Sequence, residues 1–201
     1  MVKNTSIPPY TVRVILVSMD GKRLNVGCGT DIKKGWVNLD AAAVRGVDVV
    51  HDIEQLPLPF LDEYFDEILC QDVLEHIDYP RVLKDLHRIL KFGGTLRVRV
   101  PHFTSKNNFV DPTHRKLFSV STFDFFICGV KLKEKRAYYF DFAFAKIVHR
   151  RISFERSSRW FFYNRLIDRI VNRSPTAQRF YESTGLSRIF PAENIIITLQ
   201  K

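Results

Sequence analysis

Short apolar runs alternate with turn residues and one helical segment between residues 22 and 101, and this alternation limits the fold more than any other feature. Four runs are interpreted as buried strands, 23–26, 37–40, 47–50 and 65–70, and a fifth, 95–100, alternates polar and apolar residues up to Pro101. Between the last two, residues 82–90 are apolar at helical spacing, with Gly93-Gly94 as the stop signal. The pattern predicts a doubly wound α/β sheet, which binds ligands beyond the carboxyl ends of its strands.

The last third of the chain is basic and rich in aromatic residues. From residue 131 to 181, thirteen Lys and Arg face four Asp and Glu, which accounts for the whole net charge of +9. Residues 138–145 and 147–154 fit one or two strands, residues 160–171 fit an amphipathic helix, and residues 195–199 fit a closing strand. No linker divides the chain, so we expect one domain over residues 1–201.

Composition excludes several classes of protein. No apolar run reaches the ~20 residues that span a bilayer, and residues 12–19 contain Arg13 and lack the cleavage site of a signal peptide. The three cysteines form no C-x-x-C pair, which predicts reduced thiols, no disulfide and no zinc framework. We therefore expect a soluble cytoplasmic protein without a metal.

The segment 24–30 is a strand that runs into a G-x-G turn, where missing side chains let a ligand approach the backbone. A dinucleotide-binding fingerprint needs a third glycine at position 32, which is Ile32. This departure disfavours a dehydrogenase. An ordinary tight turn is the structural alternative.

Five motifs follow in order: L-x-x-G-C-G at 24–29, D-x-x-x-L-P at 52–57, F-D-x-I at 65–68, L-E-H at 74–76 and R-x-L-K-x-G-G at 88–94. In these motifs the chain resembles the class I S-adenosylmethionine-dependent methyltransferases, in their small-molecule, type 11-like branch. The resemblance implies a Rossmann-like three-layer sandwich with seven mostly parallel strands, the last one reversed. It also implies a cofactor-binding half, 22–101, and a substrate-side half, 102–201.

The resemblance assigns contacts with S-adenosylmethionine, and with its product S-adenosylhomocysteine, to eight positions: Asn25, Gly27, Cys28, Gly29, Asp40, Asp52, Ile53 and Gln71. The glycine turn would line the methionine part. The Asp40 carboxylate would bind the two ribose hydroxyls, and Asp52 and Ile53 would contact the adenine.

Two departures from the family pattern stand out. Asn25 replaces the usual acid of the first strand, so no charge faces the sulfonium from this position. Only residues 30–38 separate the glycine turn from the strand end at Asp40, too few for a full helix. A subset of the family with G-W-x-N-x-D at 35–40 resembles this arrangement. We expect a shortened first crossover and a more open cofactor pocket, with Trp36 in a packing role.

A hydroxyl acceptor needs a base near the methyl group, and histidines beyond the fourth and fifth strands are candidates. His76 lies in L-E-H, and Asp111 and His114 lie in a D-P-T-H turn that could place both on one side. We predict that the acid–base group is either His76 or the pair Asp111 and His114, so all three are candidate catalytic residues. Hydrogen-bonded structural histidines are the alternative, which weighs most for His102.

The predicted activity is methyl transfer to a small or carrier-linked acceptor, by O-methylation, with a sugar or polysaccharide precursor as candidate. The basic segment 131–181 has three interpretations. It is a solvated face, or it binds a phosphorylated or lipid-linked acceptor. In the third interpretation, residues 159–173 contact acidic lipid at the inner face of the membrane. Nucleic acid fits less well because no RNA-binding module is recognisable. An RNA methyltransferase and a non-catalytic cofactor-binding regulator are the alternative functions.

Overall fold

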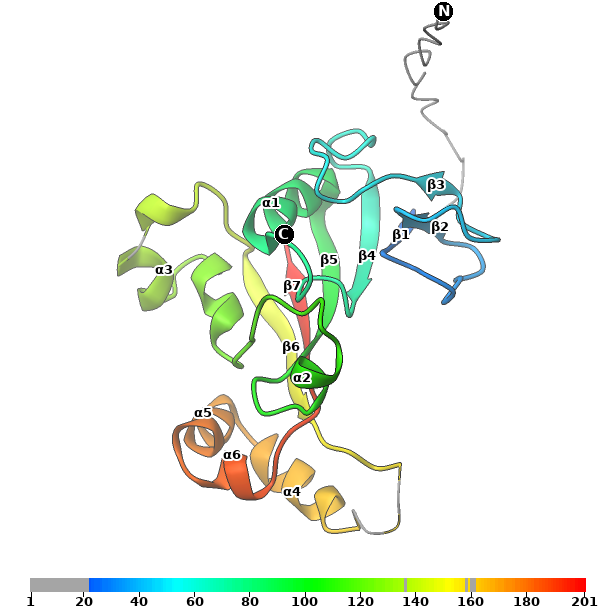
Figure 1. Cartoon of the computed structure of the whole chain (residues 1–201). Helices are drawn as coiled ribbons and strands as arrows, with labels where there is room; N and C mark the ends of the chain where they lie inside the picture. The colour runs from blue at the N-terminus through cyan, green and yellow to red at the C-terminus, as the bar shows by residue number, and fades with distance from the viewer. Residues whose placement is uncertain (1–21, 136, 158, 160–161) are drawn as a thin grey trace, which may run out of the picture.

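A computed structural model describes residues 22–201 except 136, 158, 160 and 161. Its seven-stranded sheet has the order β3-β2-β1-β4-β5-β7-β6 (Figure 1). The strands are β1 Arg23–Val26, β2 Val37–Asp40, β3 Val49–Val50, β4 Phe65–Gln71, β5 Leu90–Pro101, β6 Lys146–Ser153 and β7 Asn194–Gln200. Strands β1 to β5 pair in parallel, and β7 is antiparallel to both β5 and β6. The expected Rossmann-like sheet with a reversed last strand is confirmed.

The helices cluster in the middle and at the end of the chain. They are α1 Tyr79–Ile89, α2 Asn107–Val110, α3 Lys131–Lys135, α4 Asn164–Val171, α5 Pro175–Ser183 and α6 Leu186–Ile189, with 3₁₀ turns η1 Thr122–Phe126 and η2 Ala137–Tyr139. Figure 1 shows α4, α5 and α6 gathered beyond the end of β6. We call residues 164–189 the C-terminal helical lobe.

Helix α1 forms because its apolar residues recur on one face, and Val82, Leu83, Leu86 and Ile89 are all buried in the main core. The glycines predicted to stop this helix lie instead within β5, which begins directly at Leu90. The strand needs a glycine at position 94, because a Cβ there would lie 2.9 Å from the Lys91 carbonyl oxygen and 3.0 Å from that of Asp66.

The first crossover is short, as predicted: residues 27–36, all of them described, contain no helix. The buried side chain of Asn38 orders this loop. Its Oδ1 accepts from the Lys33 amide at 2.8 Å, and its Nδ2 donates to the carbonyls of Lys33 and Trp36 at 3.1 and 3.2 Å. One amide side chain thus satisfies backbone groups that a crossover helix would otherwise pair.

Of the candidates 138–145 and 147–154, only the second becomes a strand, β6, and the closing strand predicted at 195–199 becomes β7. Residues 138–145 form η2 and irregular backbone, because their alternating Phe140, Phe142 and Phe144 pack against the main core. The predicted helix at 160–171 begins at Asn164, and Trp160 lies outside the described residues, as does the segment 12–19. All three cysteines are free, as expected.

Candidate active site

The carboxyl ends of β1, β2, β3 and β4 meet at one edge of the sheet and carry the residues predicted to bind the cofactor. Gly27 and Gly29 both have left-handed backbone, with φ of 62° and 49°. A Cβ on Gly27 would lie 2.3 Å from Cγ2 of Val73, so the loops after β1 and β4 touch at this glycine. At Gly29 no described atom lies within 4 Å of such a Cβ, which leaves open space beside the turn.

The Asp40 carboxylate is held at the end of β2 by two backbone amides. Oδ2 accepts from the Gly29 N–H at 2.7 Å, and Oδ1 accepts from the Ala42 N–H at 2.8 Å. Because each carboxylate oxygen has two lone pairs, both oxygens can accept one further hydrogen bond. A half-buried carboxylate fixed in this way fits two vicinal hydroxyls beside the glycine turn.

The other predicted cofactor residues have different surroundings. Asp52 is exposed after β3 and accepts from the Glu54 amide at 2.9 Å, and Ile53 is buried in the main core. Gln71 ends β4 and is half-buried. Cys28 is buried, and burial raises the pKa of its thiol, so it stays a neutral packing group. Nδ2 of Asn25 donates to the Asp31 carbonyl at 2.8 Å and to Asn38, which turns this amide toward the loop.

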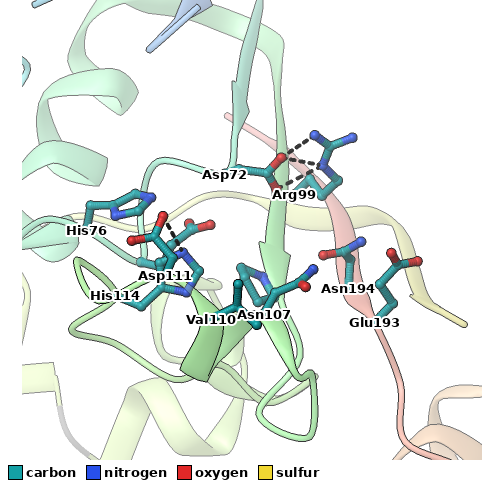
Figure 2. A pocket seen from close by; sticks show the side chains of 11 residues that line it. Asp72, His76, Arg99, Asn107, Val110, Asp111, His114, Glu193 and Asn194 are labelled. Carbon is teal, nitrogen blue, oxygen red and sulfur yellow. Dashed lines mark hydrogen bonds and ion pairs between the residues drawn. The ribbon is translucent and has the colours of Figure 1, made fainter. Parts of the chain in front are cut away.

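A cavity of about 560 Å³ continues this edge beyond β4 and β5. Its walls come from the ends of these strands, from α2 and the D-P-T-H turn, and from Glu193 and Asn194 at the start of β7 (Figure 2). The structure brings His76, Asp111 and His114 together in this cavity, as the sequence predicts for the turn. Figure 2 also shows the ion pair of Asp72 with Arg99 at its upper rim.

A hydrogen-bond relay fixes the His76 ring. The Thr113 hydroxyl donates to Asp111 Oδ1 at 2.6 Å. The Thr113 hydroxyl oxygen also lies 2.9 Å from His76 Nδ1. Because the single hydroxyl proton points to Asp111, the Thr113 oxygen accepts from Nδ1–H of His76. The lone pair of His76 Nε2 is therefore available to a ligand. The bond from Thr113 also lowers the pKa of the Asp111 carboxyl, which keeps it ionised.

His114 packs edge-on against His76, with ring centroids 4.7 Å apart. Its Nε2 lies 3.8 Å from Asp111 Oδ2, and its Nδ1 is buried without a hydrogen-bond partner in the described part of the chain. His102, by contrast, has both ring nitrogens paired, to Thr104 and Glu182 at 2.7 and 3.0 Å. His102 is therefore structural.

Sequence reasoning missed Glu75, which is 0% exposed. Neither carboxylate oxygen has a hydrogen-bond partner among the residues described, and burial raises the pKa of this carboxyl to about 7. Its backbone carbonyl accepts from the amides of Arg115 and Lys116 at 2.8 and 3.1 Å, which holds the D-P-T-H turn against the cavity. The sequence carries no local signal for this burial, because an acid in L-E-H looks like an exposed turn residue. One ligand atom from each of Glu75, His76 and His114 could contact a single cation.

Comparisons with solved structures agree with the Rossmann-like fold. The structure resembles S-adenosylmethionine-dependent methyltransferases of Archaeoglobus fulgidus (TM-score 0.52, 20% identity, 90% of this chain and 86% of that one) and Thermotoga maritima (TM-score 0.54, 20% identity, 94% and 85%). At these identities the likeness shows the fold.

The sequence comparisons cover part of the chain. Residues 19–98 match the family model described as a methyltransferase domain. An uncharacterized protein of Methanocaldococcus jannaschii is 39% identical over 87 residues, which cover 42% of this chain and 39% of that protein. Residues 19–98 are thus similar to a methyltransferase domain, and the fold of the described residues is similar to that of S-adenosylmethionine-dependent methyltransferases.

The residues at the edge of the sheet fit this cofactor, since open space at Gly29 adjoins a carboxylate suited to ribose hydroxyls. Replacing Asp40 with Asn should weaken S-adenosylhomocysteine binding about 10- to 100-fold, because two charge-assisted hydrogen bonds are each worth about 1.5–3 kcal/mol and one is lost. Isothermal calorimetry measures this loss. Asp66→Asn is the matched control, since Asp66 pairs with Lys91 at the opposite end of β4 and should bind as the wild type does. Equal affinity of all three proteins would remove Asp40 from the site.

Proposed function

We propose that the protein transfers the methyl group of S-adenosylmethionine to a hydroxyl of a small or carrier-linked acceptor held in the cavity beyond β4. The observation that carries this proposal is the cluster of His76, Asp111 and His114 in a cavity that continues the cofactor edge. The loops that carry Gly27 and Val73 touch, so the two parts of the site share a wall.

Bound S-adenosylmethionine supplies an electrophilic methyl carbon, and the chain has to align an acceptor oxygen behind it. Such positioning can contribute ~7–11 kcal/mol to the lowering of the barrier. His76 Nε2 faces the acceptor with a fixed lone pair, and Asp111 and His114 complete a polar wall. We propose that these groups orient the hydroxyl and receive its proton.

The remaining walls of the cavity favour a polar acceptor. Asn107 and Asn194 offer amides, and Asp72 and Glu193 offer carboxylates beside the Arg99 guanidinium. Such a set of donors and acceptors matches the many hydroxyls of a sugar. This chemistry supports a sugar or polysaccharide precursor.

An acceptor panel tests this function. We expect S-adenosylhomocysteine to accumulate with sugar nucleotides or polyprenyl-diphosphate-linked sugars, and mass spectrometry of the product to show one added methyl on oxygen. Methylated RNA in a parallel reaction would instead support the RNA methyltransferase. Binding of S-adenosylmethionine without turnover on any member of the panel would support the non-catalytic regulator.

The C-terminal helical lobe supports a lipid-linked acceptor. Around α4, the exposed fractions of Phe162, Leu166 and Ile170 are 77%, 60% and 56%. Arg165 and Arg169 are exposed between them, while Asn164, Asp168 and Val171 form the buried face of the helix. We call these five exposed residues the α4 surface. Apolar side chains and arginines on one exposed face match an acidic lipid headgroup layer.

The chain runs from the lobe into β7 through Glu193 and Asn194, both of which line the cavity, so this segment connects the lobe with the cavity. We propose that the α4 surface docks on anionic lipid and holds a lipid-linked acceptor near the site. The described residues contain no helix long and apolar enough to cross a bilayer.

Vesicle sedimentation tests this docking. The protein should bind phosphatidylglycerol-containing vesicles in a salt-sensitive way and not bind phosphatidylcholine vesicles. The variant Phe162→Ser/Leu166→Ser/Ile170→Ser should lower binding at least about 10-fold, because about 25 cal/mol is lost per Å² of apolar surface withdrawn from the membrane. Phe92→Ser, at an 87% exposed residue in β5, is the control. Equal loss in both variants, or a salt-sensitive gel shift with RNA and none with vesicles, would overturn this proposal.

A further inference from the structure

Glu75 is an unusual residue for an interior position. Its side chain is 0% exposed, and no described donor reaches either carboxylate oxygen. Removing an ionised carboxylate from water without a partner is costly, so buried carboxylates in proteins are paired, hydrogen-bonded or bound to a metal. The described neighbours of Glu75 provide neither an ion pair nor a hydrogen bond to its carboxylate.

The imidazoles of His76 and His114 lie close to the Glu75 carboxylate. The relay through Thr113 leaves the lone pair of His76 Nε2 available, and His114 Nδ1 is buried and without a partner. One ligand atom from each of the three residues lies within 4.8 Å of the other two. Ligands at about 2.0–2.2 Å from one ion are at most about 4.4 Å apart, so side-chain rotations must bring the three atoms closer together to complete the set.

The surroundings of the imidazoles also match a metal centre. Histidine ligands in proteins commonly direct their second ring nitrogen to a carboxylate or another acceptor, which fixes the ring and its tautomer. Here Asp111 lies behind both rings. Its Oδ1 accepts from the Thr113 hydroxyl, whose oxygen accepts from His76. Its Oδ2 lies 3.8 Å from His114 Nε2.

We infer that Glu75, His76 and His114 bind one divalent transition-metal cation, of the Zn²⁺ or Mn²⁺ type. Two nitrogens and one carboxylate oxygen favour such ions over Mg²⁺ and Ca²⁺, which prefer oxygen ligands alone. Three protein ligands leave a coordination position for an oxygen from the cavity. The role of this ion in methyl transfer rests on the proposed function. The inferred site departs from the expectation of a protein without a metal.

The ion would activate the acceptor. A hydroxyl bound to a divalent cation loses its proton more readily, so its oxygen becomes a better nucleophile toward the methyl carbon. His76 and His114 would then act as ligands of the ion, and the hydroxyl proton would pass to the Asp111 carboxylate beside it. As the new oxygen–carbon bond forms, the methyl–sulfur bond breaks and its electron pair stays on the sulfur of S-adenosylhomocysteine.

Metal titration of the full chain tests the site. Protein stripped with a chelator should bind about one Zn²⁺ per chain by calorimetry and bind Mg²⁺ much more weakly. Co²⁺ in place of Zn²⁺ should give the visible absorption of a histidine-bound ion. Glu75→Gln should reduce Zn²⁺ affinity at least 100-fold, and Asp66→Asn, at a carboxylate at the opposite end of β4, should leave it unchanged.

Thermal unfolding of the stripped proteins provides a second readout. Glu75→Gln keeps the side-chain shape and removes the charge of one ligand oxygen, so it should respond to Zn²⁺ differently from the wild type. Zn²⁺ should raise the unfolding temperature of the wild type and of Asp66→Asn, and leave that of Glu75→Gln unchanged.

The outcomes separate this inference from the proposed function. No Zn²⁺ binding, or equal binding by Glu75→Gln, would overturn the metal site, and so would full methyl transfer by stripped protein. Loss of S-adenosylhomocysteine binding by the wild type would overturn the proposed function instead. That binding is measured on the same stripped protein and uses none of the three ligands.

Discussion

His76→Ala should lower the rate of methyl transfer by about 100- to 10,000-fold, the range that one acid–base group contributes. Its affinity for S-adenosylhomocysteine should remain that of the wild type. The relay through Thr113 uses only Nδ1 of His76, so Nε2 is left for the acceptor. The rate should therefore depend on this imidazole both if Nε2 takes the hydroxyl proton and if Nε2 binds an ion. The ring lies outside the cofactor crevice, which is why binding should survive.

Two variants sharpen this test. Thr113→Val keeps the imidazole and removes the hydroxyl that fixes its tautomer, so the rate should fall by about 10-fold, less than for His76→Ala. His149→Ala, at an exposed position in β6, should leave the rate unchanged. Single-turnover kinetics at saturating S-adenosylmethionine measure all three. A rate for His76→Ala within twofold of the wild type would remove His76 from the site.

Gly27→Ala should abolish cofactor binding and destabilise the fold. The new methyl group would lie 2.3 Å from Cγ2 of Val73, and the backbone at φ 62° is strained for any residue with a Cβ. The left-handed backbone costs about 1–2 kcal/mol, and the overlap adds about 1–3 kcal/mol. The turn would relieve the overlap by moving away from β4, which disturbs the wall that the cofactor needs.

The double variant Gly27→Ala/Val73→Ala separates these two costs. It makes room for the methyl group, so it should recover part of the stability and of the S-adenosylhomocysteine affinity, and the backbone cost should remain. Urea unfolding and calorimetry on the four proteins of the cycle measure the coupling between the two sites. Strictly additive effects of the two substitutions would contradict the contact between Gly27 and Val73.

Local patterns predicted the elements that position the cofactor. Buried parallel strands and helix α1 are encoded by continuous or periodic apolar residues, so 23–26, 37–40 and 65–70 all appear as strands close to the predicted bounds. The same holds for the D-P-T-H turn, whose short-range hydrogen bonds place Asp111 and His114 together.

Features that depend on distant contacts were not predictable in this way. Asn38 looks like an ordinary strand residue, and its role depends on a loop that folds back onto it. Glu75 resembles an exposed turn acid until the turn at 111–116 covers it. Residues 138–145 alternate like a strand, yet the core formed by Phe126 and its neighbours determines their path.

A crystal structure with S-adenosylhomocysteine tests the central claim most directly. The account predicts the ribose hydroxyls on the Asp40 carboxylate, the homocysteine part along Gly27 and Gly29, and the sulfur directed toward the cavity of His76 and His114. A crevice that stays empty at saturating ligand, or a ligand bound elsewhere on the chain, would contradict it.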